Sequence, residues 1–292
     1  MATGVLHQYT PRLVAFEYGT ATHDNVLLFV GGLGDGLETV PYVPLLADKL
    51  APMGWSVAQV LISSSYRGWG TGTLARDADE IAQAVDYFRR RKPAGSKIAL
   101  MGHSTGCQDT MQLLVRRSSS SDSTSPLLSG AILQAPVSDR EAMHLLFPDQ
   151  AAPLLTYALA QQAAGNGAEI LPKRYSDLFF DTPITADRWI SLAKKEGDDD
   201  FFSSDLDDTV LSSTFGAVSC PLLVLVSGAD EFMPAEVSKP DLVGRWKRFV
   251  KPEYWAEKSG VVAGGRHNLG PGSASDAAED AIARVAAFLS SL

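Results

Sequence analysis

Cysteine is nearly absent from this chain of 292 residues, which contains only Cys107 and Cys220. The two lie far apart in the sequence and neither belongs to a Cys-x-x-Cys pair, so there is neither a disulfide framework nor a cysteine zinc site. A cysteine outside such patterns behaves as a small apolar residue. We therefore expect both cysteines to be buried, in a protein of a reducing compartment.

Long apolar runs and basic runs are also missing. No apolar segment approaches the roughly 20 residues of a membrane-spanning helix, and residues 1–8 lack the basic start and apolar core of a secretion signal. We therefore expect a cytoplasmic protein without a membrane partner. Acidic residues outnumber basic ones by 34 to 25, for a formal charge of −9. The only basic run, 89–92, closes a predicted helix, where cations favour the helix dipole, so no nucleic-acid partner is expected.

Metal ligands are not gathered in the sequence either. The acidic run 198–200 is the densest group of carboxylates, but no further ligands accompany it at the spacing of a cation site. We interpret the run as a solvated turn. The sequence therefore predicts neither a metal nor a cofactor.

What the sequence does contain is a regular alternation of short apolar runs with amphipathic segments, typical of an α/β domain. This pattern predicts a mostly parallel, doubly wound sheet of about eight strands, with helices on both faces. The apolar runs expected as strands are 13–18, 25–30, 55–62, 98–101, 130–135, 221–226 and 260–263. The main helices are expected at 38–50, 73–91, 108–117, 242–250 and 274–292.

The alternation is lost between residues 140 and 217, where helical patches are joined by Gly-, Asp- and Pro-rich turns. We expect this segment to be a cap inserted into a core made of residues 1–139 and 218–292. Its aromatic residues, Trp189 among them, are expected to pack the cap or to line a pocket. The polar segment 118–125 is expected to be a surface loop.

One stretch predicts the chemistry. The strand expected at 98–101 runs into Gly102-His103-Ser104-Thr105-Gly106, and a helix is expected to follow. This is the Gly-x-Ser-x-Gly pattern in the strand–turn–helix context that places a serine nucleophile on a sharp turn. Small residues on either side allow the strand and the helix to approach closely. Ser104 is therefore the expected nucleophile.

A serine hydroxyl needs a base, and the base needs an orienting acid. Of the five histidines, His267 follows the last expected strand, whereas His103 is expected to face away from the nucleophile. The acid is expected to be Asp230, with Glu231 and Asp139 as alternatives. The order Ser104, Asp230, His267 is the order of the triad in α/β-hydrolases.

Two further loops are expected at the site. The Gly-rich loop 31–36 follows an early strand, where an α/β-hydrolase supplies one amide of its oxyanion hole, so Leu33 or Gly34 and the residue after the nucleophile, Thr105, are the expected donors. The loop 63–72 follows the next strand along the chain. Its Tyr66, Arg67 and Trp69 are expected substrate contacts, together with Gly34 and Trp189, although Arg67 could equally be a surface residue stacked on Trp69.

The chain resembles an α/β-hydrolase over its whole length. Four segments, 31–36, 63–70, 102–106 and 227–231, resemble more narrowly a family of uncharacterised fungal and plant proteins. That family includes fungal siderophore hydrolases, which cleave ester bonds in fusarinine-type iron chelators. The resemblance implies a small-molecule ester, of a siderophore or a related secondary metabolite, as the substrate.

Together, these features predict a metal-independent carboxylic ester hydrolase that works through an acyl-enzyme on Ser104. Two alternatives stay open. The same triad could serve acyl transfer or carbon–carbon cleavage in a biosynthetic pathway. The scaffold could also be a ligand-binding receptor, because a fold does not determine a function.

Overall fold

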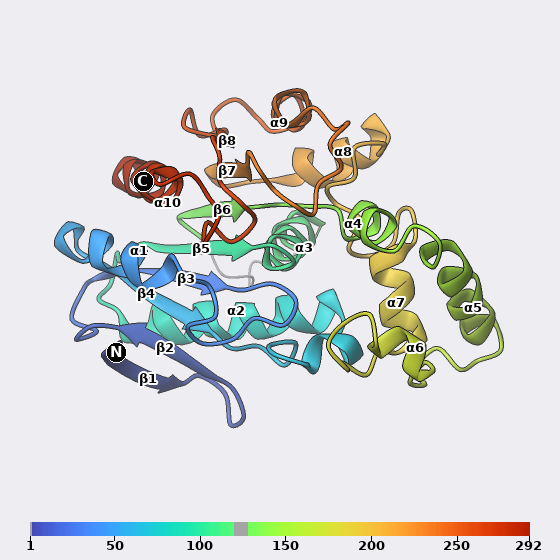
Figure 1. Cartoon of the computed structure of the whole chain (residues 1–292). Helices are drawn as coiled ribbons and strands as arrows, with labels where there is room; N and C mark the ends of the chain where they lie inside the picture. The colour runs from blue at the N-terminus through green and yellow to red at the C-terminus, as the bar shows by residue number, and fades with distance from the viewer. Residues whose placement is uncertain (1, 120–127) are drawn as a thin grey trace.

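The computed structural model describes residues 2–119 and 128–292 (Figure 1). The segment expected as a surface loop at 118–125 therefore lies mostly outside the described residues. The described part of the chain forms one eight-stranded sheet in the order β1-β2-β4-β3-β5-β6-β7-β8. Its strands are β1 (Gly4–Gln8), β2 (Val14–Tyr18), β3 (Asn25–Val30), β4 (Trp55–Val60), β5 (Ile98–His103), β6 (Gly130–Gln134), β7 (Leu222–Ser227) and β8 (Gly260–Val262).

The sheet is parallel from β4 to β8, while β1 and β2 pair antiparallel at one edge. Strand β3 lies between β4 and β5 and is almost wholly buried. Its side chains alternate between two apolar clusters: Val26 and Leu28 belong to one, Leu27 and Phe29 to the other. A continuous apolar run is what a strand covered on both faces requires.

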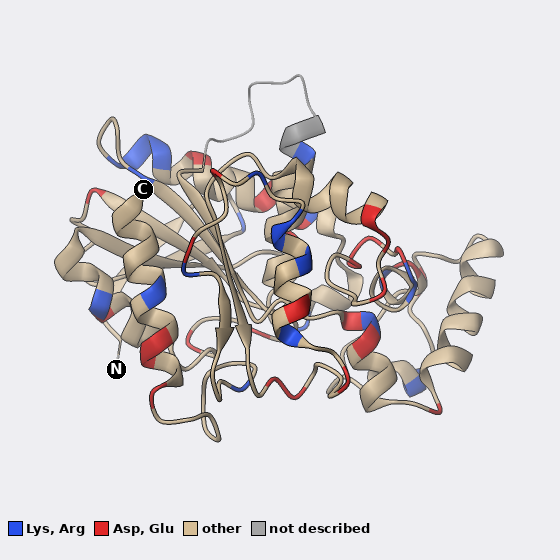
Figure 2. Ribbon diagram, turned by 90° about the horizontal axis from the view of Figure 1, so that it is seen from above, with Lys and Arg blue, Asp and Glu red and all other residues tan. Residues whose placement is uncertain are grey.

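Helices cover both faces of the sheet, as the sequence predicts (Figure 2). Residues of α1 (Val43–Leu50) and α10 (Ala277–Ser291) pack in one apolar cluster. Residues of α2 (Leu74–Arg91), α3 (Gly106–Ser119) and α9 (Lys239–Lys247) pack in the other. Within the described residues no helix combines the length and the apolar character needed to cross a membrane. Both cysteines are buried, as expected.

The sequence analysis misses one strand. Four of the five residues of β1 are exposed, so this edge strand lacks the apolar run that marks the others. The helix expected at 38–50 begins only at Val43. Pro44 lies in its first turn, where a backbone N–H would have no partner within the helix, so proline is tolerated there. The other expected strands and helices are present, with ends shifted by a few residues.

Between β6 and β7 the described chain contributes no strand to the sheet. It forms five α-helices, of which α5–α7 lie beyond one end of the strands, at the right of Figure 1. They are α4 (Asp139–Leu146), α5 (Ala151–Ala163), α6 (Lys173–Ser176), α7 (Ala186–Ala193) and α8 (Asp208–Thr214). The short 3-10 helix η3 (Phe215–Ala217) follows α8 in the same segment, whereas η1 (Ala51–Met53) and η2 (Gly68–Thr71) lie before β5.

This insertion has two parts with different packing. Residues from α4 to α7 form a third apolar cluster together with Trp69 of η2. It includes Tyr175 and Trp189, whose ring centroids lie 4.7 Å apart. By contrast, Phe202 and Phe215 belong to the apolar cluster of α2, α3 and α9, and they pack against Trp246 of α9. The insertion therefore packs partly on itself, from α4 to α7, and partly against the core, near Phe202 and Phe215.

Candidate active site

Ser104 occupies the sharp turn between β5 and α3. Its φ of 54° lies in the left-handed region, which a non-glycine residue adopts only at a cost. The turn depends on its neighbours: a Cβ at Gly102 would lie 2.1 Å from the Gly106 carbonyl oxygen, and a Cβ at Gly106 would lie 2.4 Å from the Val30 carbonyl oxygen. A Cβ at Gly32 would lie 2.5 Å from the Cβ of Ser104 itself. These three positions therefore require glycine for Ser104 to stand where it does.

The structure brings Ser104, His267 and Asp230 together. The Ser104 Oγ lies 2.8 Å from His267 Nε2, and the Nδ1 of the same ring lies 2.9 and 3.0 Å from the two carboxylate oxygens of Asp230. Asp230 is also held by the backbone amide of Phe232, which donates to its Oδ1 at 3.0 Å. This geometry permits His267 to accept the serine proton while Asp230 stabilises the resulting imidazolium.

The two alternative acids have other partners. Glu231 accepts a hydrogen bond from the backbone amide of His267 at 3.0 Å and forms an ion pair with Arg266 at 3.2 Å. Burial raises the pKa of Glu231, but these interactions outweigh it and hold the pKa below its usual value. Asp139 accepts a hydrogen bond from the side chain of Gln108 at 2.6 Å. The geometry therefore favours Asp230 as the partner of His267, and Glu231 as a support of the loop that carries it.

A residue that the sequence analysis does not single out, Gln134, ties the site together. It ends β6, where its Oε1 accepts from Tyr42 at 3.0 Å and from His103 at 2.5 Å, and its Nε2 donates to the backbone oxygen of His267 at 3.2 Å. The sequence signal that could have identified it is a glutamine inside the apolar run 130–135; the structure buries this side chain completely, and a buried amide needs partners.

His103 does not face away from the site as expected. It lines the same pocket as Ser104, and its ring centroid lies 5.1 Å from that of His267. Burial, reinforced by the charge of His267, lowers the pKa of His103 to about 4. At neutral pH its ring is uncharged, so His103 can support the site through Gln134 but does not compete with His267 as a proton carrier.

The loop 31–36 and the turn before α3 bring Leu33 and Thr105 beside Ser104 in the pocket lining. In the described part of the chain, no hydrogen bond from the amide of Leu33 or Thr105 is seen. Asp35 shapes the loop by accepting from the Gly32 amide at 2.8 Å. Leu33 and Thr105 therefore have the position and the available N–H groups of an oxyanion hole, whereas Gly34 is absent from the lining.

Above Ser104 lies a pocket of about 430 Å³, within the range of small-molecule sites. Its lining is mostly apolar, and more than half of the apolar residues come from α4 and from the loop after α6. The lining residues are Leu33, Asp35, His103, Ser104, Thr105, Val137, Asp139, Ala142, Met143, Leu146, Phe147, Leu178, Phe179, Phe180, Phe232, His267 and Asn268.

None of the five expected substrate contacts lines this pocket, and this corrects the sequence-based expectation. Trp69 and Trp189 are 3 % and 1 % exposed because they pack in the apolar cluster of α4–α7. Arg67 is exposed and lies outside the lining. Tyr66 accepts a hydrogen bond from the Leu37 amide at 3.0 Å, so it supports the end of the loop 31–36. Gly34 turns that loop with a φ of 83°.

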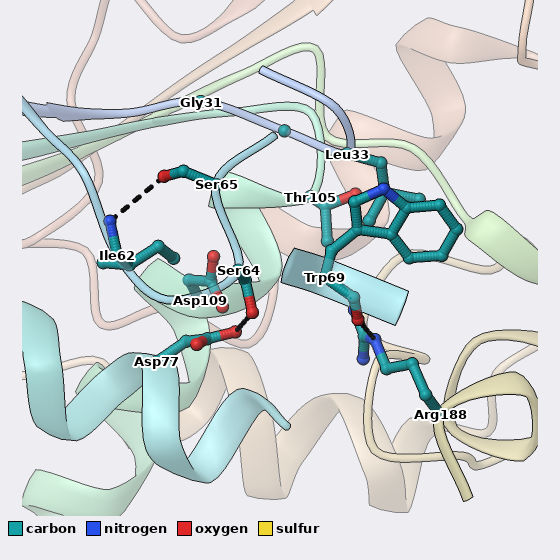
Figure 3. A pocket seen from close by; sticks show the side chains of 11 residues that line it. Gly31, Leu33, Ile62, Ser64, Ser65, Trp69, Asp77, Thr105, Asp109 and Arg188 are labelled. Carbon is teal, nitrogen blue, oxygen red and sulfur yellow. Dashed lines mark hydrogen bonds between the residues drawn. The ribbon is translucent and has the colours of Figure 1, made fainter. Parts of the chain in front are cut away.

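Behind the loop 31–36 lies a second, much smaller cavity of about 10 Å³, the space of a single water molecule (Figure 3). Its walls carry the carboxyl groups of Asp77 and Asp109 and the guanidinium of Arg188. Arg188 joins the insertion to the core: its Nε donates to the backbone oxygen of Trp69 at 3.1 Å, and its Nη1 pairs with Asp199 at 2.5 Å. Burial and nearby carboxylates raise the pKa of Asp109 well above its usual value.

Replacing Arg188 by methionine is expected to lower the free energy of unfolding by about 3–5 kcal/mol, because it leaves the buried Asp199 carboxylate without its cation. Urea denaturation followed by circular dichroism measures the change. The matched control is Lys173→Met, which breaks an exposed ion pair with Asp177 and is expected to leave the unfolding midpoint near that of the wild type. Equal midpoints for Arg188→Met and the wild type would contradict this assignment.

Known proteins resemble this chain over nearly its whole length. The family model described as "Protein of unknown function (DUF1749)" matches residues 1–290. A UPF0613 protein of Schizosaccharomyces pombe is 41 % identical, over 94 % of this chain and 92 % of its own length. The fusarinine C esterase of Aspergillus fumigatus is 37 % identical, over 99 % of this chain and 96 % of its own length.

Among solved structures, the siderophore hydrolase EstB from Aspergillus fumigatus superposes with a TM-score of 0.85 at 36 % identity, covering 100 % of this chain and 98 % of that one. An α/β-hydrolase fold protein of unknown function superposes at 0.65 with 19 % identity, which bears on the fold alone. The fold is thus that of an α/β-hydrolase, as expected from the sequence. With a family model matching nearly its whole length, the chain belongs to the DUF1749 family.

Proposed function

We propose that this protein is a serine-dependent carboxylic ester hydrolase whose catalytic residues are Ser104, His267 and Asp230. The observation that carries the proposal is the continuous hydrogen-bonded array from Ser104 through His267 to Asp230, opening on a pocket of about 430 Å³. Relatives at 36–37 % identity over nearly the whole chain are named as an esterase and a siderophore hydrolase, which supports the same reaction class.

In this mechanism the Ser104 oxygen attacks the ester carbonyl carbon as its proton passes to His267 Nε2. The carbonyl oxygen becomes an oxyanion that the amides of Leu33 and Thr105 stabilise. The tetrahedral species collapses, the alcohol leaves with the proton from His267, and the acyl group stays on Ser104. A water molecule, deprotonated by His267, then attacks the acyl-enzyme and releases the acid, which restores the serine hydroxyl.

We propose a siderophore-type ester, or a related secondary-metabolite ester, as the substrate. The support is the activity for which the two relatives are named and a pocket lined by four phenylalanines, Phe147, Phe179, Phe180 and Phe232. Such a pocket suits a compact molecule with an apolar part. The iron of a ferric chelator would enter as part of the substrate.

A turnover screen tests this function. Ferric fusarinine-type esters, short-chain aryl esters and fungal macrolactones are compared, with products identified by mass spectrometry. Free acid and alcohol from the hydroxamate esters would support the proposal. Cleavage of aryl acetates alone would reject the siderophore substrate but keep the esterase. A transferred acyl group, or stoichiometric binding without product, would instead favour the acyltransferase or the receptor.

We further propose that the part of the insertion from α4 to α7 acts as a cap over the pocket. Phe180, in the loop after α6, is 90 % exposed, lines the pocket and has a φ of 52°. An exposed aromatic side chain in a strained backbone is poorly stabilised without a ligand. It can gain apolar burial when a substrate fills the pocket.

Replacing Phe180 by serine is therefore expected to raise KM for bulky apolar esters by about tenfold, equivalent to about 1.4 kcal/mol of lost contact. Its kcat for 4-nitrophenyl acetate is expected to stay near that of the wild type, because this ester is too small to reach the residue. Leu159→Ser on α5, another exposed apolar position outside the lining, serves as the control. Equal KM values for Phe180→Ser and Leu159→Ser would contradict a role for Phe180.

A further inference from the structure

The lining of the pocket above Ser104 contains carboxylic acids but no strongly basic side chain. Among its lining residues are two carboxylic acids, Asp35 and Asp139, but no lysine or arginine. The remaining titratable groups of the lining are the histidines His103 and His267. Of these four residues, the mechanism uses only His267 directly, while Asp35 and His103 already have structural partners. Asp139 is the ionisable group of the pocket that the proposed reaction leaves without a role.

The position of Asp139 is set by two elements. It is the first residue of α4, directly after the cap residue Ser138, whose hydroxyl accepts from the Glu141 amide. From α3, Gln108 donates to Asp139 Oδ2 at 2.6 Å. In the described part of the chain, no hydrogen bond to its Oδ1 is seen. Since Asp139 lines the pocket and is only partly buried, this second oxygen remains available to a ligand.

The arginines near Asp139 are already paired with other carboxylates. Asp199, Asp200 and Asp109 act on it electrostatically. Asp199 is paired with Arg188 and Asp200 with Arg140, so neither of these guanidinium groups is left to pair with Asp139. Burial, followed by the charge of Asp199, raises the pKa of Asp139 to about 8. A cation bound beside this carboxyl would favour its ionised form. An anionic ligand would find no compensating charge among the lining residues.

We propose that Asp139 forms a subsite for a cationic group of the substrate, an ammonium or substituted ammonium carried on the ester near the scissile bond. The phenylalanine rings of the same pocket would contact the apolar surface of such a group, because the faces of aromatic rings attract cations. The subsite rests on the proposed ester hydrolysis and specifies its substrate class: esters with a positive charge are preferred over neutral and acidic ones. Asp139 thereby has a role in specificity, distinct from that of Asp230.

The experiment uses the full chain and paired 4-nitrophenyl esters with acyl chains of three to six carbons. One member of each pair ends in a trimethylammonium group and the other in the isosteric tert-butyl group, so the charge does not titrate. At pH 8.5, wild-type kcat/KM is expected to be about tenfold or more higher for the cationic ester at the best chain length. The ratio is expected to fall between pH 8.5 and pH 6.5, as Asp139 becomes protonated.

Asp139→Asn is expected to bring that ratio close to one and to remove its pH dependence. Glu141→Gln, which removes a charge from the same helix outside the pocket lining, is expected to keep the wild-type ratio. A wild-type ratio of one or less at every chain length, or a ratio that Asp139→Asn leaves intact, would overturn the subsite. Turnover of the tert-butyl esters reports on the proposed hydrolase separately, so failure of the subsite and failure of the esterase are distinguishable.

Discussion

Replacing Ser104 by alanine is expected to lower kcat for ester hydrolysis by roughly 10⁴- to 10⁶-fold, the range seen when the nucleophile of a serine triad is removed. Without the Oγ, which lies 2.8 Å from His267 Nε2, no acyl-enzyme can form. The fold should persist, because alanine keeps the Cβ and therefore the same backbone cost at a φ of 54°. Steady-state kinetics and the melting temperature measure the two effects.

Covalent labelling gives an independent readout of the same residue. An organophosphonate is expected to modify wild-type Ser104 once per chain and to leave Ser104→Ala unmodified. Ser290→Ala is the control, since its hydroxyl bonds only within α10, to the Ala286 carbonyl. It should retain both activity and labelling. Hydrolysis at the wild-type rate by Ser104→Ala, or labelling at another serine, would refute the proposed nucleophile.

Asp230→Asn is expected to lower kcat by about 10⁴-fold while leaving KM nearly unchanged. The asparagine amide can donate toward His267 Nδ1, which favours the tautomer with its proton on Nε2, and this ring can no longer accept the Ser104 proton. The structure holds that nitrogen 2.9 Å from Asp230 Oδ2. Comparison of kcat for neutral aryl esters measures the loss.

Two matched variants test the assignment of the acid. Asp139→Asn should leave kcat for neutral esters far above that of Asp230→Asn, because Asp139 bonds Gln108. Glu231→Gln should have an intermediate effect, because Glu231 accepts a hydrogen bond from the backbone amide of His267 and so supports the loop that carries this residue. If Asp139→Asn lost more activity on neutral esters than Asp230→Asn did, the catalytic acid would have to be reassigned to Asp139.

The sequence by itself determined the features that depend on neighbouring residues. The apolar run 25–30 specifies a strand because it matches burial on both faces. The segment 102–106 specifies a turn because only glycine fits at 102 and 106. The order of Ser104, Asp230 and His267 also has a local basis, since each follows a recognisable strand. Strand β1 was not predicted, because its residues are mostly exposed and do not form an apolar run.

The tertiary structure alone decided which side chains meet. Ser104 and His267 are separated by 163 residues, and only the parallel order of β5 to β8 brings their loops to one edge of the sheet. The pocket lining depends equally on how the insertion packs. Trp189 and Phe180 both belong to an aromatic-rich segment, yet Trp189 is 1 % exposed inside the apolar cluster and Phe180 is 90 % exposed at the pocket. Composition does not distinguish two such residues: aromatic residues as a class are often buried, but which individual residue is buried depends on long-range contacts.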